Sequence, residues 1–112
     1  MSQVTTISKK QDFDEFINRK NTLVIVFYGA GWCDACTDVY PMYERIQKKY
    51  SNILSMCYVD ISQAKLDFSS IPVFESYYNG TSISSMVGTD IPSLKDFIKK
   101  SFLVAKKKGH KI

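Results

Sequence analysis

The pattern of apolar and polar residues predicts a chain in which strands alternate with helices. Residues 22–28, TLVIVFY, are almost continuously apolar and rich in β-branched and aromatic side chains, which is typical of a strand buried on both faces of a sheet. Residues 53–61 predict a second strand, and residues 3–7 a short edge strand. We expect residues 22–28 to lie at the centre of the sheet.

Two helices are predicted in the first half of the chain from apolar residues at helical spacing. The first covers residues 9–19, where Ser8 and Gln11 resemble a capping box. The second covers residues 33–49 and contains Pro41. Because a proline inside a helix removes one backbone hydrogen bond, we expect the helix axis to be kinked there.

The second half of the chain predicts a short helical segment, a hairpin and a last helix. Residues 62–68 predict a short helix or helical turn. Strands at residues 73–78 and 82–87 flank an Asn-Gly pair, which favours a tight antiparallel hairpin. Asp90 is placed to cap the last helix. The expected order of elements is β-α-β-α-β-α-β-β-α.

Length and composition indicate a single globular domain. The chain has 112 residues, of which 45% are hydrophobic and 23% are charged, and this length suits one hydrophobic core. No apolar run approaches the roughly 20 residues that a membrane-spanning helix requires. We expect one domain over residues 1–105 and a basic, disordered tail over residues 106–112, because no linker or repeat divides the chain.

The formal net charge of +4 is concentrated near the C-terminus. Lys106, Lys107, Lys108 and Lys111 lie there, and the other 11 basic residues balance the 11 acidic residues. A short basic run at a chain end is typically solvated. The charge therefore favours neither a nucleic acid nor a membrane as the partner.

The N-terminal sequence and the cysteine count both favour the cytoplasm. Residues 1–16, MSQVTTISKKQDFDEF, lack the basic and then apolar order of a secretory signal, and their early acidic residues are unlike a mitochondrial presequence. The chain has three cysteines, an odd number that suits a reducing compartment. In such a compartment a CxxC pair is more often catalytic or metal-binding than structural.

Cys33 and Cys36 form a CxxC pair between a predicted strand and a predicted helix, and three interpretations are open: a redox pair, half of a metal site, or two incidental core cysteines. A structural zinc ion usually takes four ligands, whereas only Cys57 and His110 remain, and neither has paired spacing. The position of the pair at a helix start, behind Trp32, favours redox chemistry over incidental burial.

The start of a helix is a suitable place for a reactive thiol. A cysteine in the first turn lies near free backbone N–H groups and the positive end of the helix dipole, and both favour the thiolate, which is the form that attacks a disulfide. The first sulfur of such a pair can lie at the exposed end while the second is turned inward. Cys33 would then attack a substrate disulfide, and Cys36 would displace the substrate from the mixed disulfide.

The segments around this pair resemble the thioredoxin family, and the resemblance extends over nearly the whole chain. The segments that carry it are, in chain order, VFYGAGWC, the CxxC pair, Pro41, YVDI, SSIPVF, YYNG and MVG. The resemblance implies a three-layer α/β/α thioredoxin fold with a central mixed sheet of four to five strands.

The resemblance also implies the parts of a substrate site. Cys33 and Cys36 would form the redox-active disulfide, and Pro72 would be a cis-proline that faces it. The backbone of Ile71 would pair with the substrate as a short added strand. The apolar docking face around the sulfurs would consist of Tyr28, Ala30, Trp32, Ile71, Val87 and Gly88.

Two residues between the cysteines depart from the family pattern. Thioredoxins typically have Gly-Pro there, whereas this chain has Asp34 and Ala35. In the family these two positions modulate the redox potential. The negative charge of Asp34 disfavours a second negative charge on Cys33, so we expect the pKa of the Cys33 thiol to lie above that of strongly oxidising relatives.

A further departure lies in the predicted central strand. Phe27 stands where the family usually carries a buried carboxylate that assists proton transfer at the second cysteine, and Met56 stands where a lysine frequently neighbours that carboxylate. The pair is consistent with an apolar replacement of buried charges. We expect resolution by Cys36 to be slower, or to use water as the proton carrier.

The resemblance thus predicts a thiol-disulfide oxidoreductase that reduces protein disulfides, a reaction of electron transport and cell redox homeostasis. We expect protein substrates that carry disulfides, an external reductase or glutathione system, a monomer, and no cofactor or metal. Two alternatives stay open: a binding or assembly module with weak redox turnover, and a net disulfide oxidant or isomerase. Ala35, where isomerases have histidine, disfavours the isomerase.

Overall fold

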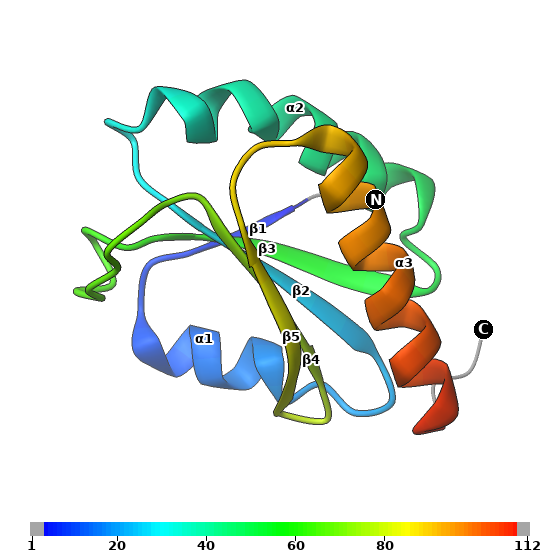
Figure 1. Ribbon diagram of the computed structural model, residues 1–112. Coiled ribbons are helices and arrows are strands. Elements are labelled where there is room, and N and C mark those ends of the chain that lie inside the picture. The colour runs from blue at the N-terminus through cyan, green and yellow to red at the C-terminus, as the bar shows by residue number, and fades with distance from the viewer. Residues whose placement is uncertain (1–3, 110–112) are drawn as a thin grey trace.

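The computed structural model describes residues 4–109, and strand β2 (Leu23–Gly29) runs through the middle of its sheet (Figure 1). All seven residues of β2 are buried, as its apolar sequence predicted. The strand pairs in parallel with β3 (Leu54–Asp60) and antiparallel with β4 (Val73–Tyr78). The sheet is therefore mixed, and its five strands have the order β1-β3-β2-β4-β5.

The two edge strands are β1 (Thr5–Ile7) and β5 (Thr81–Val87). Strand β5 pairs antiparallel with β4 through the predicted Asn-Gly turn, in which Asn79 and Gly80 have φ values of 52° and 81°. Two consecutive residues with positive φ characterise the type I′ turn, whose twist matches that of the flanking strands. The predicted hairpin is therefore confirmed.

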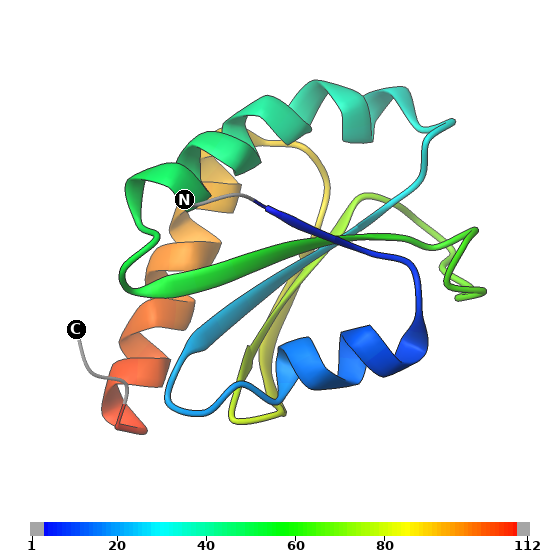
Figure 2. The same ribbon diagram turned by 180° about the vertical axis from the view of Figure 1, so that it is seen from behind.

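Three helices cover the two faces of the sheet: α1 (Lys10–Ile17), α2 (Asp34–Lys49) and α3 (Ile91–Lys107). Helix α1 lies on one face and α2 and α3 lie on the other (Figures 1 and 2). Neighbouring residues of β2 point to opposite faces: the ring of Phe27 contacts Tyr43 of α2, and the ring of Tyr28 contacts Phe13 of α1. This is the predicted three-layer α/β/α thioredoxin fold.

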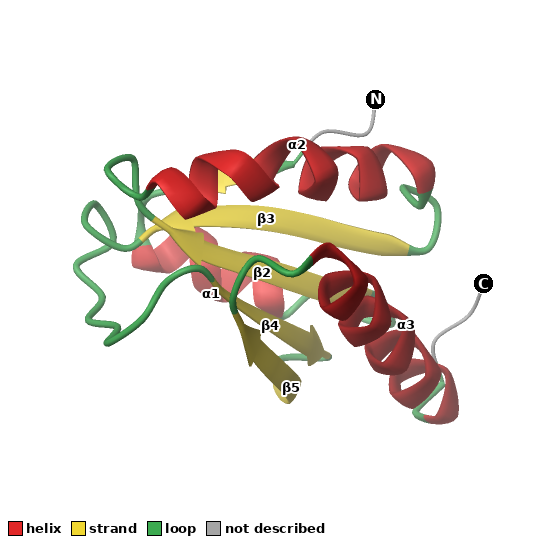
Figure 3. Ribbon diagram, turned by 45° about the horizontal axis from the view of Figure 1, so that its top comes forward, coloured by secondary structure: helices red, strands yellow, loops and turns green. Residues whose placement is uncertain are grey.

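Helices α2 and α3 contain the proline and the N-cap aspartate that the sequence analysis assigned to them. Asp90 is the N-cap of α3, and its carboxylate accepts a hydrogen bond from the N–H of Ser93 at 3.0 Å. Pro41 lies inside α2, which continues beyond it to Lys49. The long α2 and α3 lie across the same face of the sheet, as Figure 3 shows from another side.

Of the short helix or helical turn predicted at residues 62–68, only the turn is present: residues 61–65 form turns, in which the carbonyl of Asp60 accepts the N–H of Ala64 at 3.0 Å, and residues 66–68 have no regular structure (Figure 3). The carboxylate of Asp60 accepts hydrogen bonds from the N–H groups of Ser62 and Gln63 at 2.9 and 3.4 Å. An aspartate that binds the following N–H groups stabilises a turn. Lys65 has a φ of 57°, a left-handed conformation that a helix cannot contain.

Two smaller predictions also need correction. The expected capping box of Ser8 and Gln11 is not formed, because the N-cap of α1 is Lys9 and no side chain caps this helix. Helix α3 runs through Lys107, so the first residues of the predicted tail at 106–112 are helical. The remainder of that prediction, at residues 110–112, lies outside the described residues.

Candidate active site

Cys33 and Cys36 lie where β2 leads into α2, and they form a disulfide with a Cα–Cα distance of 5.3 Å. Cys33 is the N-cap of the helix, in an extended conformation, and Cys36 lies in the first turn. The exposed fraction is 8% for Cys33 and 2% for Cys36. The first sulfur-bearing residue is thus the more accessible of the two, as the sequence predicted.

The backbone of α2 places a hydrogen-bond donor on the first sulfur. Sγ of Cys33 accepts the N–H of Cys36 at 3.2 Å. The carbonyl of Cys33 accepts the N–H of Thr37, which closes the first helical hydrogen bond. A donor and the positive helix end both favour negative charge on this sulfur in the reduced protein. Asp34 and Ala35 are exposed in the same turn, and the charge of Asp34 opposes that effect.

The sulfur of Cys36 lies close to Gly29, the last residue of β2. A Cβ atom placed on Gly29 would lie 3.1 Å from Sγ of Cys36, and 3.0 Å from the rings of both Phe27 and Tyr58. These separations are shorter than ordinary van der Waals contact, so a side chain there would require the neighbouring sulfur and rings to shift by a few tenths of an ångström. Gly29 therefore allows the sulfur of Cys36 and the two aromatic rings to approach one another at the end of β2.

Phe27 is fully buried beneath the disulfide and is surrounded by aromatic rings. Its ring centroid lies between 4.7 and 6.2 Å from those of four neighbours: Tyr40, Tyr43, Tyr58 and Phe74. This environment would penalise a charged group. The aromatic cluster explains how the chain accommodates an apolar residue at the position where the family usually has a carboxylate.

Met56 is the diagonal neighbour of Phe27 on the adjacent strand β3. The register pairs Met56 with Ile25, whereas Phe27 pairs with Tyr58. Met56 is fully buried, which is consistent with an apolar replacement of a buried charge. In the register, Tyr58 is the residue directly opposite Phe27 on β3.

The tyrosines around the site keep their protons at neutral pH. Burial raises the pKa of Tyr43 well above its usual value, and its hydroxyl lies 2.7 Å from the carbonyl of Cys57 and 3.0 Å from that of Ile25. Burial, and then the charge of Asp60, raise the pKa of Tyr58. Neither phenol ionises in the range where thiols react, so neither replaces a carboxylate as a base.

Trp32 precedes the disulfide and is 71% exposed. Its indole N–H donates a hydrogen bond to Oγ of Ser62 at 3.2 Å, and the N–H of Ser62 donates to the carboxylate of Asp60. The turn that follows β3 thus positions the indole ring beside the site. The sequence analysis did not identify Ser62 and Asp60, although an aspartate followed by small polar residues is a turn signal.

The Ile71–Pro72 peptide bond is cis, as the family resemblance implied. Pro72 is buried and directly precedes β4, and Ile71 is partly exposed. The carbonyl of Pro72 accepts the N–H of Gly88 at 3.0 Å. This hydrogen bond joins the start of β4 to the end of β5, where Val87 is 61% exposed.

The sheet register brings these segments to one end of the sheet, where β2 ends and β4 begins. Tyr28 near the end of β2 pairs with Val73 at the start of β4, and Val73 pairs with Val87 at the end of β5. The segments that carry Trp32 and Pro72 therefore leave the sheet at the same end as the disulfide (Figures 1 and 2). Gly29 is the site residue that sequence reasoning missed, since there it only marked the end of a strand.

Within residues 4–109, no three His, Cys, Asp or Glu side chains gather in a way that could hold a metal ion, and His110 lies outside the described residues. None of the helices in this part of the chain combines the length and hydropathy that a membrane span requires.

Known proteins show the same combination of fold and sequence. The sequence model of the Thioredoxin family matches residues 4–100. Thioredoxin 1 of Plasmodium falciparum is 32% identical over 102 residues, which cover 87% of this chain and 96% of the relative. A solved structure of Plasmodium falciparum thioredoxin, with 31% identity, superimposes with a TM-score of 0.79 over 87% of this chain and 98% of the other. A Schistosoma mansoni thioredoxin, with 27% identity, covers 88% of this chain and 94% of its own, with a TM-score of 0.78.

Proposed function

Since the chain belongs to the thioredoxin family, and is thus a thiol-disulfide oxidoreductase of the protein-disulfide reductase type, we propose that Cys33 is its nucleophile and Cys36 its resolving thiol. The observation that carries this assignment is the hydrogen bond from the N–H of Cys36 to Sγ of Cys33. The same donor would stabilise a thiolate on Cys33 when the disulfide is reduced. The greater exposure of Cys33 also supports its role as the attacking group.

The proposed reaction proceeds in two exchanges. The thiolate of Cys33 attacks one sulfur of the substrate disulfide, so that a Cys33–substrate disulfide forms and the other substrate sulfur leaves as a thiolate. The thiolate of Cys36 then attacks Sγ of Cys33 and releases the second substrate thiolate. The substrate gains two electrons and two protons, and the enzyme retains the Cys33–Cys36 disulfide.

Phe27 modulates the second exchange in this proposal. The Cys36 thiol must lose a proton before it attacks, and the aromatic cluster around Phe27 supplies no carboxylate that could accept it. We assign that role to water at the edge of the site. Asp34 and Ala35 modulate the first exchange, because both lie in the helical turn that carries the Cys33 sulfur.

Substrates would dock on the exposed apolar surface beside the disulfide. Trp32 and Val87 are 71% and 61% exposed, and large exposed apolar side chains beside a reactive group mark an interaction site. The backbone of Ile71, just before Pro72, would pair with an extended substrate segment by strand addition. Gly88 would border this segment, since its N–H binds the carbonyl of Pro72.

Membership of the family implies protein substrates that carry disulfides, and a reductase that regenerates the dithiol. The finer parts of the proposal are that an external reductase or a glutathione system supplies the electrons, and that the protein acts as a monomer in the cytoplasm, away from nucleic acids and membranes. A third cysteine, the buried free thiol Cys57, supports a reducing compartment.

The test is the reduction of a model protein disulfide by the wild type and by Cys33→Ser, together with titration of the Cys33–Cys36 potential against glutathione. The proposal predicts turnover by the wild type alone and a potential below about −200 mV. The second candidate is a binding or assembly module, because the aromatic cluster around Phe27 holds no carboxylate. A wild type that binds the substrate without turnover would favour this candidate. A potential well above that value would favour an oxidant.

A further inference from the structure

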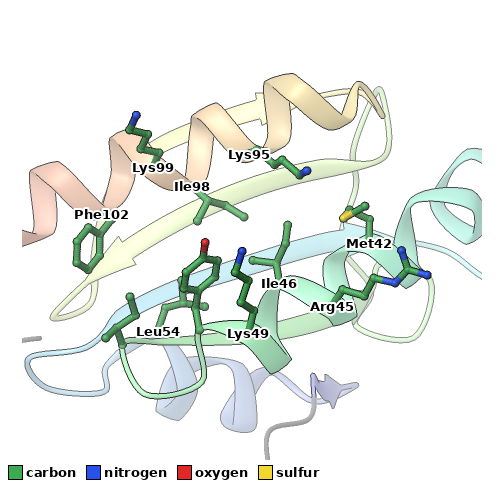
Figure 4. A pocket seen from close by; sticks show the side chains of 11 residues that line it. Met42, Arg45, Ile46, Lys49, Leu54, Lys95, Ile98, Lys99 and Phe102 are labelled. Atoms are coloured by element: carbon green, nitrogen blue, oxygen red, sulfur yellow. The ribbon is translucent and has the colours of Figure 1, made fainter.

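A pocket of about 630 Å³ lies between the C-terminal half of α2 and α3, on the face of the sheet opposite α1 (Figure 4). This volume is within the range of small-molecule sites, roughly 300–1,000 Å³. The lining residue of α2 that lies nearest the disulfide is Met42, six residues after Cys36 and so about 9 Å further along the helix axis, and none of the lining residues is a residue of the redox site. The pocket is therefore separate from the redox site.

The floor of the pocket is apolar and belongs to the core. Ile46 of α2, Leu54 of β3 and Ile98 of α3 line it, and each has an exposed fraction of 7% or less. Phe102 of α3 closes one end (Figure 4) and lies beyond residues 4–100, which the family model matches. An apolar chain that enters this pocket would contact side chains that are already fixed by packing.

The walls of the pocket are basic. Arg45 and Lys49 come from α2, and Lys95 and Lys99 come from α3 (Figure 4). No acidic residue is among the side chains that line the pocket. Two helices thus present four positive charges around one apolar floor, and like charges at this density favour an anion.

These four charges are not neutralised by neighbouring carboxylates. Among residues 4–109 the ion pairs are Lys10–Asp14 and Lys100–Asp96, and neither includes a lysine or arginine of the pocket. Asp96, the acid of α3, is paired with Lys100 at 2.9 Å and does not line the pocket. The ammonium group of Lys49 lies 5.3 Å from the ring centroid of Tyr50, which also lines the pocket.

We propose that this pocket binds a soluble amphiphile with a single apolar chain and an anionic head group, such as a carboxylate or phosphate. The chain lies on the floor formed by Ile46, Leu54 and Ile98, and the head group lies among the four cations. Charge complementarity selects the anion. The apolar atoms are recessed between two helices, so the chain enters the protein and the protein does not insert into a membrane.

Titration of the ¹⁵N-labelled full chain with dodecyl phosphate, below its micelle concentration, tests this proposal by amide chemical shifts. We expect saturable shifts in α2 and α3 around Ile46 and Ile98. Decyl phosphate, two methylenes shorter, should bind roughly tenfold more weakly because less apolar surface is buried. Inorganic phosphate and dodecyltrimethylammonium, which lack the chain and the negative charge respectively, should leave these amides unshifted.

Charge reversal identifies the head-group site. The double variant K95E/K99E changes two exposed side chains and should weaken binding of dodecyl phosphate roughly tenfold. The double variant K9E/K20E is the matched control, since it makes the same change in charge at two exposed lysines that do not line the pocket, and it should bind within about twofold of the wild type.

Four results would overturn the proposal: no saturable shift with dodecyl phosphate, equal binding of the cationic amphiphile, equal loss in K9E/K20E, or binding to anionic vesicles with none to the monomeric amphiphile. An acidic amphipathic peptide that shifts the same amides while dodecyl phosphate does not would replace the proposed ligand with a protein partner. None of these measurements depends on the redox activity, so their outcome is independent of the proposed function.

Discussion

The sulfur of Cys36 lies against the backbone of Gly29, so close that a Cβ atom on Gly29 would stand 3.1 Å from it. This contact places the inner sulfur at the end of β2, close to the rings of Phe27 and Tyr58. Cys33, the more accessible of the two cysteines, lies at the start of α2 as its N-cap. The strand end and the helix start thus position the two cysteines differently, and this difference supports the separate roles proposed for them.

Gly29→Ala tests how tightly the inner sulfur is held. The new methyl group would meet the Cys36 sulfur and two rings at 3.0–3.1 Å, so we expect the free energy of unfolding to fall by about 1–3 kcal/mol through overpacking. Gly31→Ala is the matched control, because its Cβ would meet nothing closer than 4.0 Å, the carboxylate of Asp60. Urea unfolding of both variants gives the comparison, and equal stability would contradict the packing argument.

Phe27→Asp places a carboxylate where the family usually has one, but in this chain the frequent lysine neighbour is replaced by Met56 and the surroundings are aromatic rings. Burial raises the pKa of the new carboxyl in the folded state above its unfolded value of about 3.9. The folded state then binds more protons, so the free energy of unfolding should fall as pH rises from about 4 through the raised pKa. At pH 7 we expect a loss of about 3–5 kcal/mol relative to the wild type.

The control for this variant is Phe27→Leu, which loses ring contacts but introduces no titratable group. It should cost about 1–2 kcal/mol with the same pH dependence as the wild type. Urea unfolding between pH 4 and pH 8 separates the two variants. If the free energy of unfolding of Phe27→Asp did not depend on pH more than that of the wild type, the aromatic cluster would accommodate a charge. This result would contradict the claim that the surroundings of Phe27 penalise one.

Asp34→Asn tests whether the charge between the cysteines opposes the thiolate. Removal of one negative charge beside Cys33 should lower the pKa of the Cys33 thiol by about half a pH unit, as expected for two charges in a solvated setting. Thiolate absorbance of the reduced protein measures this pKa. Asp38→Asn, one turn further along α2, is the control and should change it less. An unchanged or raised value in Asp34→Asn would contradict the assignment.

Cys57 should be inert in the folded protein. It is fully buried, and burial raises the pKa of its thiol despite the smaller opposing effect of Arg19. In the oxidised protein we expect no reaction with a thiol reagent under native conditions and complete labelling of Cys57 in urea. The native rate should be at least about 1,000-fold slower, because labelling requires unfolding. Rapid native labelling, absent in Cys57→Ala, would refute this expectation.

The elements with strong local signals could be predicted from the sequence. The unbroken apolar run of β2 identified the central strand, and the Asn-Gly pair fixed the hairpin because few other residues adopt two positive φ values. The CxxC pair at a helix start identified the reactive cysteines. These features depend on residues that are close together in the chain, so the sequence alone was sufficient.

The features that depend on tertiary contacts could not be predicted in the same way. The turn after β3 is a different case, because it depends on local contacts: the Asp60 carboxylate binds the N–H groups two and three residues ahead, a turn signal that the helix prediction did not use. The proximity of Gly29 to Cys36 arises only when the strand end meets the helix. The support of Trp32 by Ser62 likewise joins residues 30 positions apart.

The most direct test of the central claim is to trap the mixed disulfide. In Cys36→Ser the first exchange proceeds and the second does not, so a protein substrate with a disulfide should remain linked to Cys33, and peptide mass spectrometry should locate the link there. Cys33→Ser should trap far less, because the sulfur of Cys36 is turned inward. Equal trapping by both variants, or a link at Cys36 alone, would contradict the assignment of Cys33 as the nucleophile.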